Sequence, residues 1–335
     1  MDGGTVPSGM VGTTPEVKMN RSAPSTETAW AYRAAGAAMC SGRISRIPMA
    51  LILSYCEAMT ITPDAPAETR SIDGVLLTPK EVKIYGQESL MPSANVAEER
   101  LRRKQKLAGA LRIFGRLGFG EGVAGHITVR DPEFPDHFWV NPLGLSFRHM
   151  RVSDLILVNH HGEVVYGEYA VNRAAYVLHA AVHTARPDVI AAAHAHSVYG
   201  KAFSSLGIKL DALTQDSCAF YENNVVISDH GGAVVFEEAA GRDFAEAFGQ
   251  YRAAIHQNHG HFTVGASVDE AVFWFVCFER CAQAQLAAMA AGTPKHIPHE
   301  SAVYTREQAG NAMTGWAHFQ PLWQEICRTD PELFD

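Results

Sequence analysis

A regular alternation of helical and extended apolar patterns, which starts near residue 94, is the feature that most constrains the fold of this chain. Apolar residues recur at helical spacing over 96–114, and Gly118 ends that run. The patterns that follow are short strands at 124–130 and 137–142, a hairpin over 154–167, a helix at 172–185, a buried strand at 188–197, a helix at 236–249, two strands within 252–265, and a helix from a capping box at 267–270 to about 292. Strands that alternate with helices predict an α/β fold.

The first 95 residues lack this regularity. Residues 1–27 are rich in Gly, Ser, Thr and Pro, a composition that favours disorder. Residues 28–95 hold short apolar runs that Pro and Gly interrupt, and all 16 histidines lie from His126 onward. We therefore predict a partly disordered N-terminal extension at 1–95, rich in Gly, Pro, Ser and Met, and a folded domain at 96–335.

The composition limits the kinds of partner and the cellular compartment that we expect for this chain. Lys and Arg number 28 and Asp and Glu 36, so the formal net charge is 28 − 36 = −8, which argues against nucleic-acid binding. No apolar run approaches the ~18 residues of a membrane-spanning helix, and the N-terminus lacks the basic start and apolar core of a secretory signal. The six cysteines are widely spaced without a CxxC pair, which favours reduced thiols and a cytoplasmic protein.

A histidine pair marks the end of the apolar strand at 188–197. His194 and His196 are two residues apart, so in a strand their imidazoles point to the same side. Two neutral imidazoles on a rigid element form half of a site for a first-row metal ion. The best third ligand is His259, in an Asn-His-Gly turn between two predicted strands, and His256 and His261 are the alternatives.

A second histidine pair lies on the helix predicted at 172–185. His179 and His183 are four residues apart, a spacing that can also chelate a metal ion. No acidic residue lies between them. We therefore interpret this pair as part of a helix face that packs on the sheet.

Seven stretches in fixed order carry a resemblance to a known family. They are AGHITVR, WVNPLGLSF, SDLILVN, HGEVVYG, ARPDVIAAAHAHS, QNHGHFTVG and DEAVFWFVCFERCAQAQ. Over about residues 96–330 the chain resembles the class II aldolase/adducin family. The resemblance implies a three-layer α/β/α sandwich around a mostly antiparallel sheet of nine strands. It also implies a divalent ion, usually zinc, bound by His194, His196 and His259.

The family covers several reactions and one non-enzymatic branch. Its members include fuculose-phosphate aldolase, ribulose-phosphate epimerase and methylthioribulose-phosphate dehydratase, and adducin is a cytoskeletal relative without catalysis. The resemblance further implies a homotetramer with its sites near the subunit interfaces.

The chain departs from the family at the positions that handle sugar phosphates. The family's general base, a Glu about 19 residues before the first metal histidine, falls at Ala175 here. Its phosphate-binding serines fall where this chain has Arg173 and Ala174. Its Asn in the first glycine turn becomes His126, and its Thr-Gly loop becomes Leu143-Gly144. Most phosphate-binding hydroxyls are therefore absent, which argues against a sugar-phosphate substrate.

Other residues at these and neighbouring positions suggest how a different substrate is handled. Arg173 suits a carboxylate, because a guanidinium binds it through two parallel hydrogen bonds. His126 and Gly144 complete the predicted substrate-binding set. The family places a catalytic Tyr close to the segment that holds Asp216 and Tyr221, so either residue is a candidate proton carrier.

We predict a metal-dependent lyase of the aldolase or decarboxylase type that acts on a small keto or hydroxy acid through a metal-stabilised enolate. Zinc is the expected ion. The first alternative is a non-haem iron oxygenase, because three histidines without a carboxylate leave Fe(II) open positions. The second is an adducin-like protein without catalysis, against which the intact metal histidines argue.

Overall fold

The computed structural model describes residues 71–72, 75–76, 83–230 and 232–335. The predicted disorder of residues 1–27, and most of the extension predicted at 1–95, lie outside the described residues. A two-residue ladder joins β1 (Ser71–Ile72) to β2 (Val75–Leu76). Among the helices of the described part, none combines the length and the apolar character that crossing a membrane requires.

One mixed sheet forms the centre of the fold. Its strands, in chain order, are β3 (His126–Arg130), β4 (Phe138–Val140), β5 (Ile156–Val158), β6 (Val164–Tyr166), β7 (Ala191–Ala195), β8 (Asn224–Ile227), β9 (Ala253–His256) and β10 (Gly260–Gly265). They lie in the order β6-β5-β4-β3-β7-β10-β9-β8, and all neighbours are antiparallel except β8 and β9. The described residues thus give eight strands, one fewer than the resemblance implies, and β8 is a strand that the sequence patterns did not predict.

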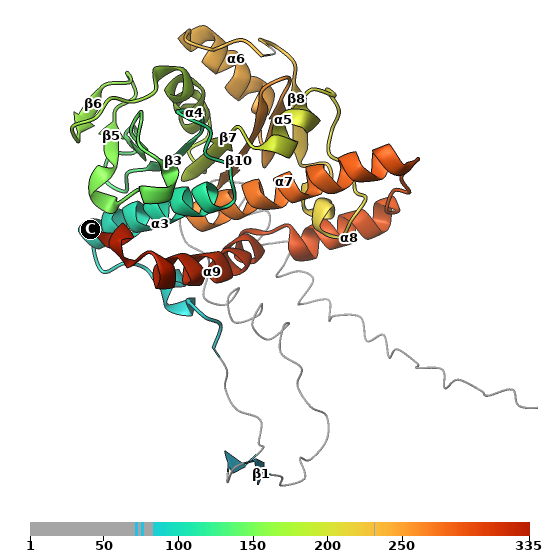
Figure 1. Ribbon diagram of the computed structural model, residues 1–335, viewed down its shortest axis with the longest axis horizontal. Helices are drawn as coiled ribbons and strands as arrows, with labels where there is room; N and C mark the ends of the chain where they lie inside the picture. Colours follow the sequence, from blue (N-terminus) through green and yellow to red (C-terminus); the bar gives the residue numbers. More distant parts are fainter. Residues whose placement is uncertain (1–70, 73–74, 77–82, 231) are drawn as a thin grey trace, which may run out of the picture. The chain divides into compact units, whose positions relative to one another are not determined.

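Helices cover both faces of the sheet (Figure 1). On one face lie α3 (Val96–Arg116), α7 (Val268–Ala291) and α9 (Ala312–Thr329). On the other lie α4 (Arg173–Ala185) and α6 (Glu238–Phe248). The remaining helices are α5 (Val198–Ser204) and α8 (His299–Ala309), with short 3-10 turns η1 (Gln87–Leu90), η2 (Phe147–His149), η3 (Val152–Asp154), η4 (Asp216–Phe220) and η5 (Pro331–Phe334). The predicted three-layer, mostly antiparallel α/β/α sandwich is confirmed.

The alternation of side chains along β7 separates two packing layers. Ala191, Ala193 and Ala195 join the core with α3 and α7, whereas Ala192 packs with α4 and α6. His194 follows Ala192 at the same spacing and so faces the α4/α6 side. The small alanines let helices approach β7 closely from both sides, which places its last residues inside the protein.

Helix starts follow local capping chemistry. The Asn95 side chain accepts the Glu98 N–H at 2.9 Å at the start of α3, and Ser267 accepts the Glu270 N–H at 3.1 Å at the start of α7. The Glu270 carboxylate accepts the N–H of Ala266, one residue before the cap. The capping box predicted at 267–270 therefore forms in a slightly shifted version, and each such cap contributes about 1 kcal/mol.

The folded unit includes residues before position 96. Ile84 and Leu90 pack against Met313 and Trp316 of α9, and the Trp316 indole donates to the Ser89 hydroxyl at 3.1 Å. This part of the predicted extension is thus packed on the domain. For the rest of residues 1–95 the predicted boundary stays a prediction.

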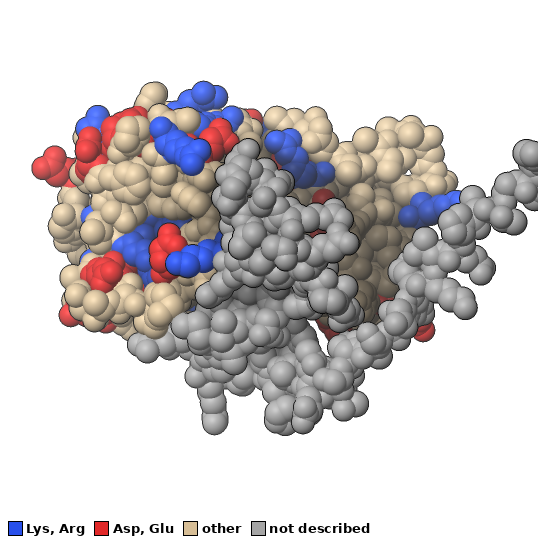
Figure 2. Space-filling model, turned by 90° about the horizontal axis from the view of Figure 1, so that it is seen from below, with Lys and Arg blue, Asp and Glu red and all other residues tan. Residues whose placement is uncertain are grey.

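Charges of both signs lie side by side on the surface. In the face seen in Figure 2, the coloured Lys and Arg groups are interspersed with Asp and Glu rather than gathered in one broad basic area. The expectation that nucleic acid is not a partner rests on the net charge and stays a prediction.

Candidate metal centre

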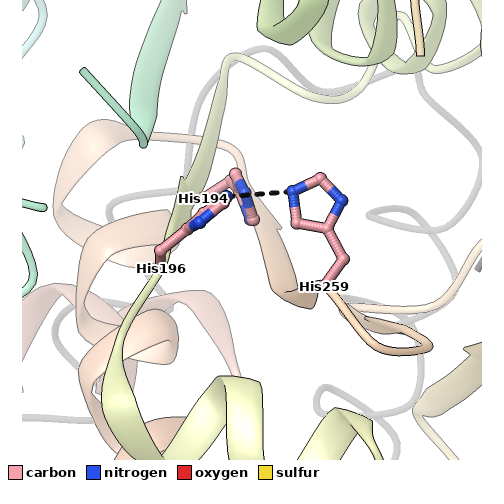
Figure 3. Close-up of side chains that lie close together, drawn as sticks. All are labelled: His194, His196 and His259. Carbon is pink, nitrogen blue, oxygen red and sulfur yellow. Dashed lines mark hydrogen bonds between the residues drawn. The ribbon is translucent and has the colours of Figure 1, made fainter. Parts of the chain in front are cut away.

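Three histidine side chains meet at the end of β7. His194 is in β7, His196 follows its last residue, and His259 stands in the turn between β9 and β10. Their rings turn toward one another (Figure 3), and one ligand nitrogen from each lies within 4.8 Å of the others. The Nε2 atoms of His196 and His259 are 3.0 Å apart. The predicted ligand set is therefore one cluster.

The hydrogen bonding of His194 leaves one nitrogen ready for a metal ion. Its Nδ1–H donates to the backbone carbonyl of His261 at 2.9 Å, which fixes the tautomer. Its Nε2 is buried and has no hydrogen-bond partner among the described residues. A metal-binding imidazole usually donates its other ring N–H to a backbone carbonyl or a carboxylate, so His194 is oriented as a ligand would be.

Burial keeps the three imidazoles neutral, the form that binds metals. Removal from water, followed by the charges of neighbouring histidines, lowers the pKa of His194 well below its usual range and that of His259 to about 3. Burial also lowers the pKa of His196. Two nitrogens on one tetrahedral zinc lie about 3.3 Å apart, close to the 3.0 Å between His196 and His259. The residues fit a divalent ion.

The two alternative ligands have other environments. The His256 ring lies 4.9 Å from the His259 ring, but its Nε2 bonds to the Asp229 carbonyl at 3.3 Å. His261 lies on the opposite face of the sheet, and its Nε2 donates to the Phe275 carbonyl at 3.2 Å. In the turn that carries His259, Asn258 adopts the left-handed backbone conformation, with φ 59°, which Asn tolerates well.

A buried carboxylate supports the segment after His196. Glu279 of α7 is 2% exposed and accepts three hydrogen bonds, from Ser197 Oγ at 2.6 Å, Tyr199 N at 2.9 Å and Gly200 N at 2.7 Å. It thereby fixes the start of α5 and the direction in which His196 leaves the sheet. Sequence analysis missed this residue, although an acidic side chain within an apolar helix is a usable signal.

The predicted substrate-binding residues lie at the start of a strand, the start of a helix and in a loop. His126 is paired with His194 across β3 and β7, and its buried Nδ1 has no partner among the described residues. Arg173 is exposed and is the first residue of α4. Gly144, with φ 91°, lines a cavity of about 290 Å³ together with Gly115, Gly120, Gly122, Leu145, Ser146, Phe147 and Arg148. Of the three, His126 lies directly beside the candidate ligand His194.

The predicted proton carriers lie in another part of this chain. Asp216 is exposed at the start of η4, which packs on α7 and α8. The Tyr221 hydroxyl is 3.0 Å from Nδ1 of His299 in α8. No hydrogen bond joins either residue to the three metal histidines within the described chain. Their catalytic role stays a prediction.

A charged pair near His196 was not anticipated from the sequence. Lys201 Nζ and Glu121 Oε2 are 2.6 Å apart, on α5 and on the glycine-rich loop before β3. After burial, Lys201 lowers and Glu121 raises the pKa of His196, so both charges act on the site. Glu121 therefore provides a carboxylate at the rim of the site, although the family's base position holds Ala175.

Comparisons with known proteins agree with this geometry. The family model described as Class II Aldolase and Adducin N-terminal domain matches residues 105–286. "Decarboxylase NovR" of Streptomyces niveus is 44% identical over 239 residues, 71% of this chain and 88% of that protein. The "4-hydroxy-3-prenylphenylpyruvate oxygenase/4-hydroxy-3-prenylbenzoate synthase" of Streptomyces roseochromogenus subsp. oscitans is also 44% identical over 239 residues, 71% of this chain and 86% of that protein.

A solved structure extends the likeness to three dimensions. The structure described as L-fuculose 1-phosphate aldolase from Glaciozyma antarctica PI12 has a TM-score of 0.68 and 45% identity, and the match covers 73% of this chain and 96% of that one. The matched region spans the whole sheet and all three histidines of the cluster. This chain belongs to the class II aldolase and adducin family.

Proposed function

We propose that this protein is a metal-dependent lyase that cleaves a carbon–carbon bond of a small keto or hydroxy acid. The observation that carries the proposal is the convergence of three neutral imidazoles, with the bare, buried Nε2 of His194 among them. His194, His196 and His259 would hold the ion, with Zn²⁺ expected first. When bound with open positions, such an ion polarises a carbonyl or carboxylate oxygen and stabilises enolate charge.

Arg173 is the residue that we expect to hold the substrate carboxylate. It is exposed at the first position of α4, and no ion pair engages it within the described residues. The Asn172 side chain donates to the Val123 carbonyl at 3.3 Å instead of capping the helix, so it does not satisfy the first N–H groups of α4. A guanidinium beside a helix N-terminus favours an anion.

Two of the relatives support an acid rather than a sugar phosphate. One is named a decarboxylase, and the name of the other contains a phenylpyruvate, which is a keto acid. The structure described as a fuculose-phosphate aldolase points to the other substrate class. The family's base position holds Ala175 and its phosphate-binding serines give way to Arg173, so we favour the acid.

An iron-dependent oxygenase is the second candidate function. Its support is specific: the cluster has three neutral histidines without a carboxylate, and one relative at 44% identity is named an oxygenase. Iron(II) in such a site keeps positions for both substrate and oxygen. An adducin-like protein without catalysis has weaker support, because a scaffold has no use for an oriented His194.

A substrate panel separates these candidates. The metal-free protein is loaded with Zn²⁺, or with Fe²⁺ under argon, and offered keto acids, hydroxy acids and fuculose, ribulose and rhamnulose phosphates, with oxygen uptake and CO₂ release recorded. We expect turnover of an acid, weakened roughly 10- to 150-fold in Arg173→Ala and partly recovered in Arg173→Lys. Substrate-dependent oxygen uptake by the Fe²⁺-loaded protein, and not by the Zn²⁺-loaded protein, would support the oxygenase. Turnover of a sugar phosphate that is unaffected at Arg173 would contradict both candidates.

We also propose a homotetrameric, cytoplasmic enzyme with its sites near subunit interfaces. In that assembly Asp216 or Tyr221 of one subunit would carry protons for the site of another, because within the described residues neither forms a hydrogen bond to the three histidines of its own chain. The four cysteines of the described residues are free thiols, which suits a reducing compartment. Light scattering of the purified protein tests the assembly, and a monomer would remove the proposed role of Asp216 and Tyr221.

A further inference from the structure

Two histidines of α4 join the metal-bearing face of the sheet through one threonine. His179 Nδ1 and His183 Nε2 are each 2.8 Å from the Thr128 hydroxyl oxygen. Both rings are 1% exposed. Thr128 is two residues along β3 from His126, so it lies on the same face as the metal ligands. The predicted packing of this helix face on the sheet is confirmed, and the two histidines also form hydrogen bonds to the sheet through Thr128.

The hydrogen-bond chain determines where each proton sits. His183 Nδ1 lies 3.3 Å from the Val189 carbonyl, which only accepts, so Nδ1 carries the hydrogen. Arg130 Nη2 lies 3.5 Å from the same nitrogen, but it points to the carbonyls of His183 at 2.6 Å and Val189 at 3.2 Å. His183 Nε2 is therefore bare and accepts the Thr128 hydroxyl hydrogen. The Thr128 oxygen then accepts from His179 Nδ1–H, which leaves His179 Nε2 without a hydrogen.

That bare nitrogen has no partner and stands close to the metal centre. His179 Nε2 is buried and accepts no hydrogen bond from the described residues. The His179 ring lies 6.0 Å from the His126 ring and 5.7 Å from the Phe262 ring, and Phe262 stacks on the metal ligand His194 at 4.0 Å. Burial lowers the pKa of His179 to about 3, so the ring is neutral at physiological pH. A buried acceptor of this kind requires a donor.

We propose that His179 Nε2 accepts a hydrogen bond from a hydroxyl group of the substrate, so that the site selects a hydroxy acid over the matching keto acid. The inference rests on the proposed function, because it names the substrate of that site. Thr128 and His183 act as positioning residues, since they hold His179 in the tautomer that accepts. A site built to bond a hydroxyl discriminates strongly against an analogue that lacks it, because the buried partner is then left unpaired.

The first experiment reads the tautomer directly and needs no turnover. Long-range ¹H–¹⁵N spectra of the full-length, zinc-loaded protein, labelled at histidine, distinguish the two neutral forms, and His179→Gln identifies the signal. We expect His179 to carry its hydrogen on Nδ1 in the wild type and in Thr128→Ser. In Thr128→Val, which keeps the shape but removes the hydroxyl, that preference should be lost. A wild-type His179 with its hydrogen on Nε2 would overturn the inference.

The second experiment measures selectivity with matched acids. Binding of 3-phenyllactate, phenylpyruvate and 3-phenylpropanoate to the zinc-loaded protein is followed by calorimetry. We expect the hydroxy acid to bind at least about tenfold more tightly than either analogue, as one satisfied hydrogen bond allows. Because the ion also favours a hydroxy acid, the decisive result is the variant pair. Thr128→Val should reduce the advantage to about threefold or less, and Thr128→Ser should restore it.

The outcomes separate this inference from the proposed function. If no acid is turned over but the tautomer and the Thr128-dependent selectivity hold, the proposed reaction fails and the hydroxyl site stands. If acids are turned over while the advantage of the hydroxy acid is the same in wild type, Thr128→Val and Thr128→Ser, the reaction stands and the inference fails. That second result would assign a buried water, rather than a substrate, to His179 Nε2.

Discussion

The two faces of the sheet use the same residue type for different purposes. His259 and His261 are two residues apart, yet His261 lies between the rings of Phe275 and Phe278, at 3.9 and 4.6 Å. His259 instead joins His194 and His196 on the opposite side. What each face packs against, rather than the identity of the side chain, decides whether an imidazole packs within the core or is available to a ligand.

The polar groups on the two faces also differ in how they are satisfied. On the α7 face, Thr263 Oγ1 donates to the Ala271 carbonyl at 2.7 Å, and the Lys106 ammonium pairs with Asp269 at 2.8 Å. Among the described residues, buried nitrogens without a hydrogen-bond partner remain at His126, His179, His194 and His256 on the α4/α6 face, and two such atoms, His261 Nδ1 and Gln320 Oε1, lie on the α7 side. Unsatisfied buried groups cost stability, and the α4/α6 face holds more of them together with the three-histidine cluster, so we expect the ligand on that face.

The largest expected effect separates the two faces by metal content. Wild-type protein should hold about one Zn or Fe ion per chain, and His194→Ala should lose most of it because a ligand is removed. His261→Phe is the matched control on the other face, and it should keep the ion despite some loss of stability. Elemental analysis after gel filtration measures both. A wild type that holds no metal and cannot be reloaded would refute the metal centre.

A second prediction compares two buried glutamates of α7. Glu279→Gln should weaken metal binding by roughly tenfold or more. In the wild type the Glu279 carboxylate accepts three hydrogen bonds from the segment next to His196, and an amide cannot accept all of them. Glu270→Gln should lower the melting temperature but leave the metal affinity unchanged, since Glu270 bonds only near the helix start. Competition with a chromophoric chelator gives both affinities. Equal losses in the two variants would mean that Glu279 acts through stability alone.

A third prediction concerns pH and the metal-free protein. Burial lowers the pKa of His261 to about 3, whereas an unfolded histidine titrates near about 6.5. Above about pH 6.5 the ring is neutral in both the folded and the unfolded protein. Below about pH 6.5 the unfolded chain takes up a proton that the folded ring does not. The free energy of unfolding therefore falls as the pH drops from about 6.5 toward 3. The slope for His261→Phe should be shallower by about 1.4 kcal/mol per pH unit.

Denaturant unfolding at several pH values, between pH 6 and 4, measures that slope. Parallel slopes for wild type and His261→Phe would show that the folded ring is protonated as readily as the unfolded one.

The smallest expected effect concerns the segment before α3. Deleting residues 1–82 should leave the free energy of unfolding of the domain nearly unchanged. Deleting residues 1–92 should lower it by about 1–3 kcal/mol, because the loss of Ile84 and Leu90 exposes part of α9. Both truncations should still bind metal. Chemical denaturation of the two proteins decides, and equal stabilities would return the domain boundary to position 95.

The sequence was most informative where local geometry sets the outcome. Strand alternation alone predicts that His194 and His196 share a side. The choice of His259 over His261 depends on register, in which His261 faces Ala195 and Phe262 faces His194. The Asn-His-Gly turn and the family resemblance favoured His259 from the sequence, but neither supplied that register. β8 was missed because its residues, Asn224–Ile227, show no alternation of polar and apolar side chains.

Contacts between distant segments could not be predicted from local patterns. Glu279 is 82 residues from its partner Ser197, so no spacing rule connects them. The same holds for the bond from Thr128 to His179, 51 residues away, which turns an ordinary helical histidine into an oriented acceptor. In both cases the function of the side chain follows from what the fold brings beside it.

The measurement that tests the central claim most directly is the X-ray absorption spectrum of the metal-loaded protein. We predict three imidazole nitrogens around the ion, with the remaining positions filled by oxygen, and a loss of one imidazole in His259→Ala. His256→Ala and His261→Phe should leave the imidazole count unchanged. Fewer than three imidazoles in the wild type, or a count that falls in His261→Phe rather than in His259→Ala, would contradict the assignment of the metal centre to the α4/α6 face.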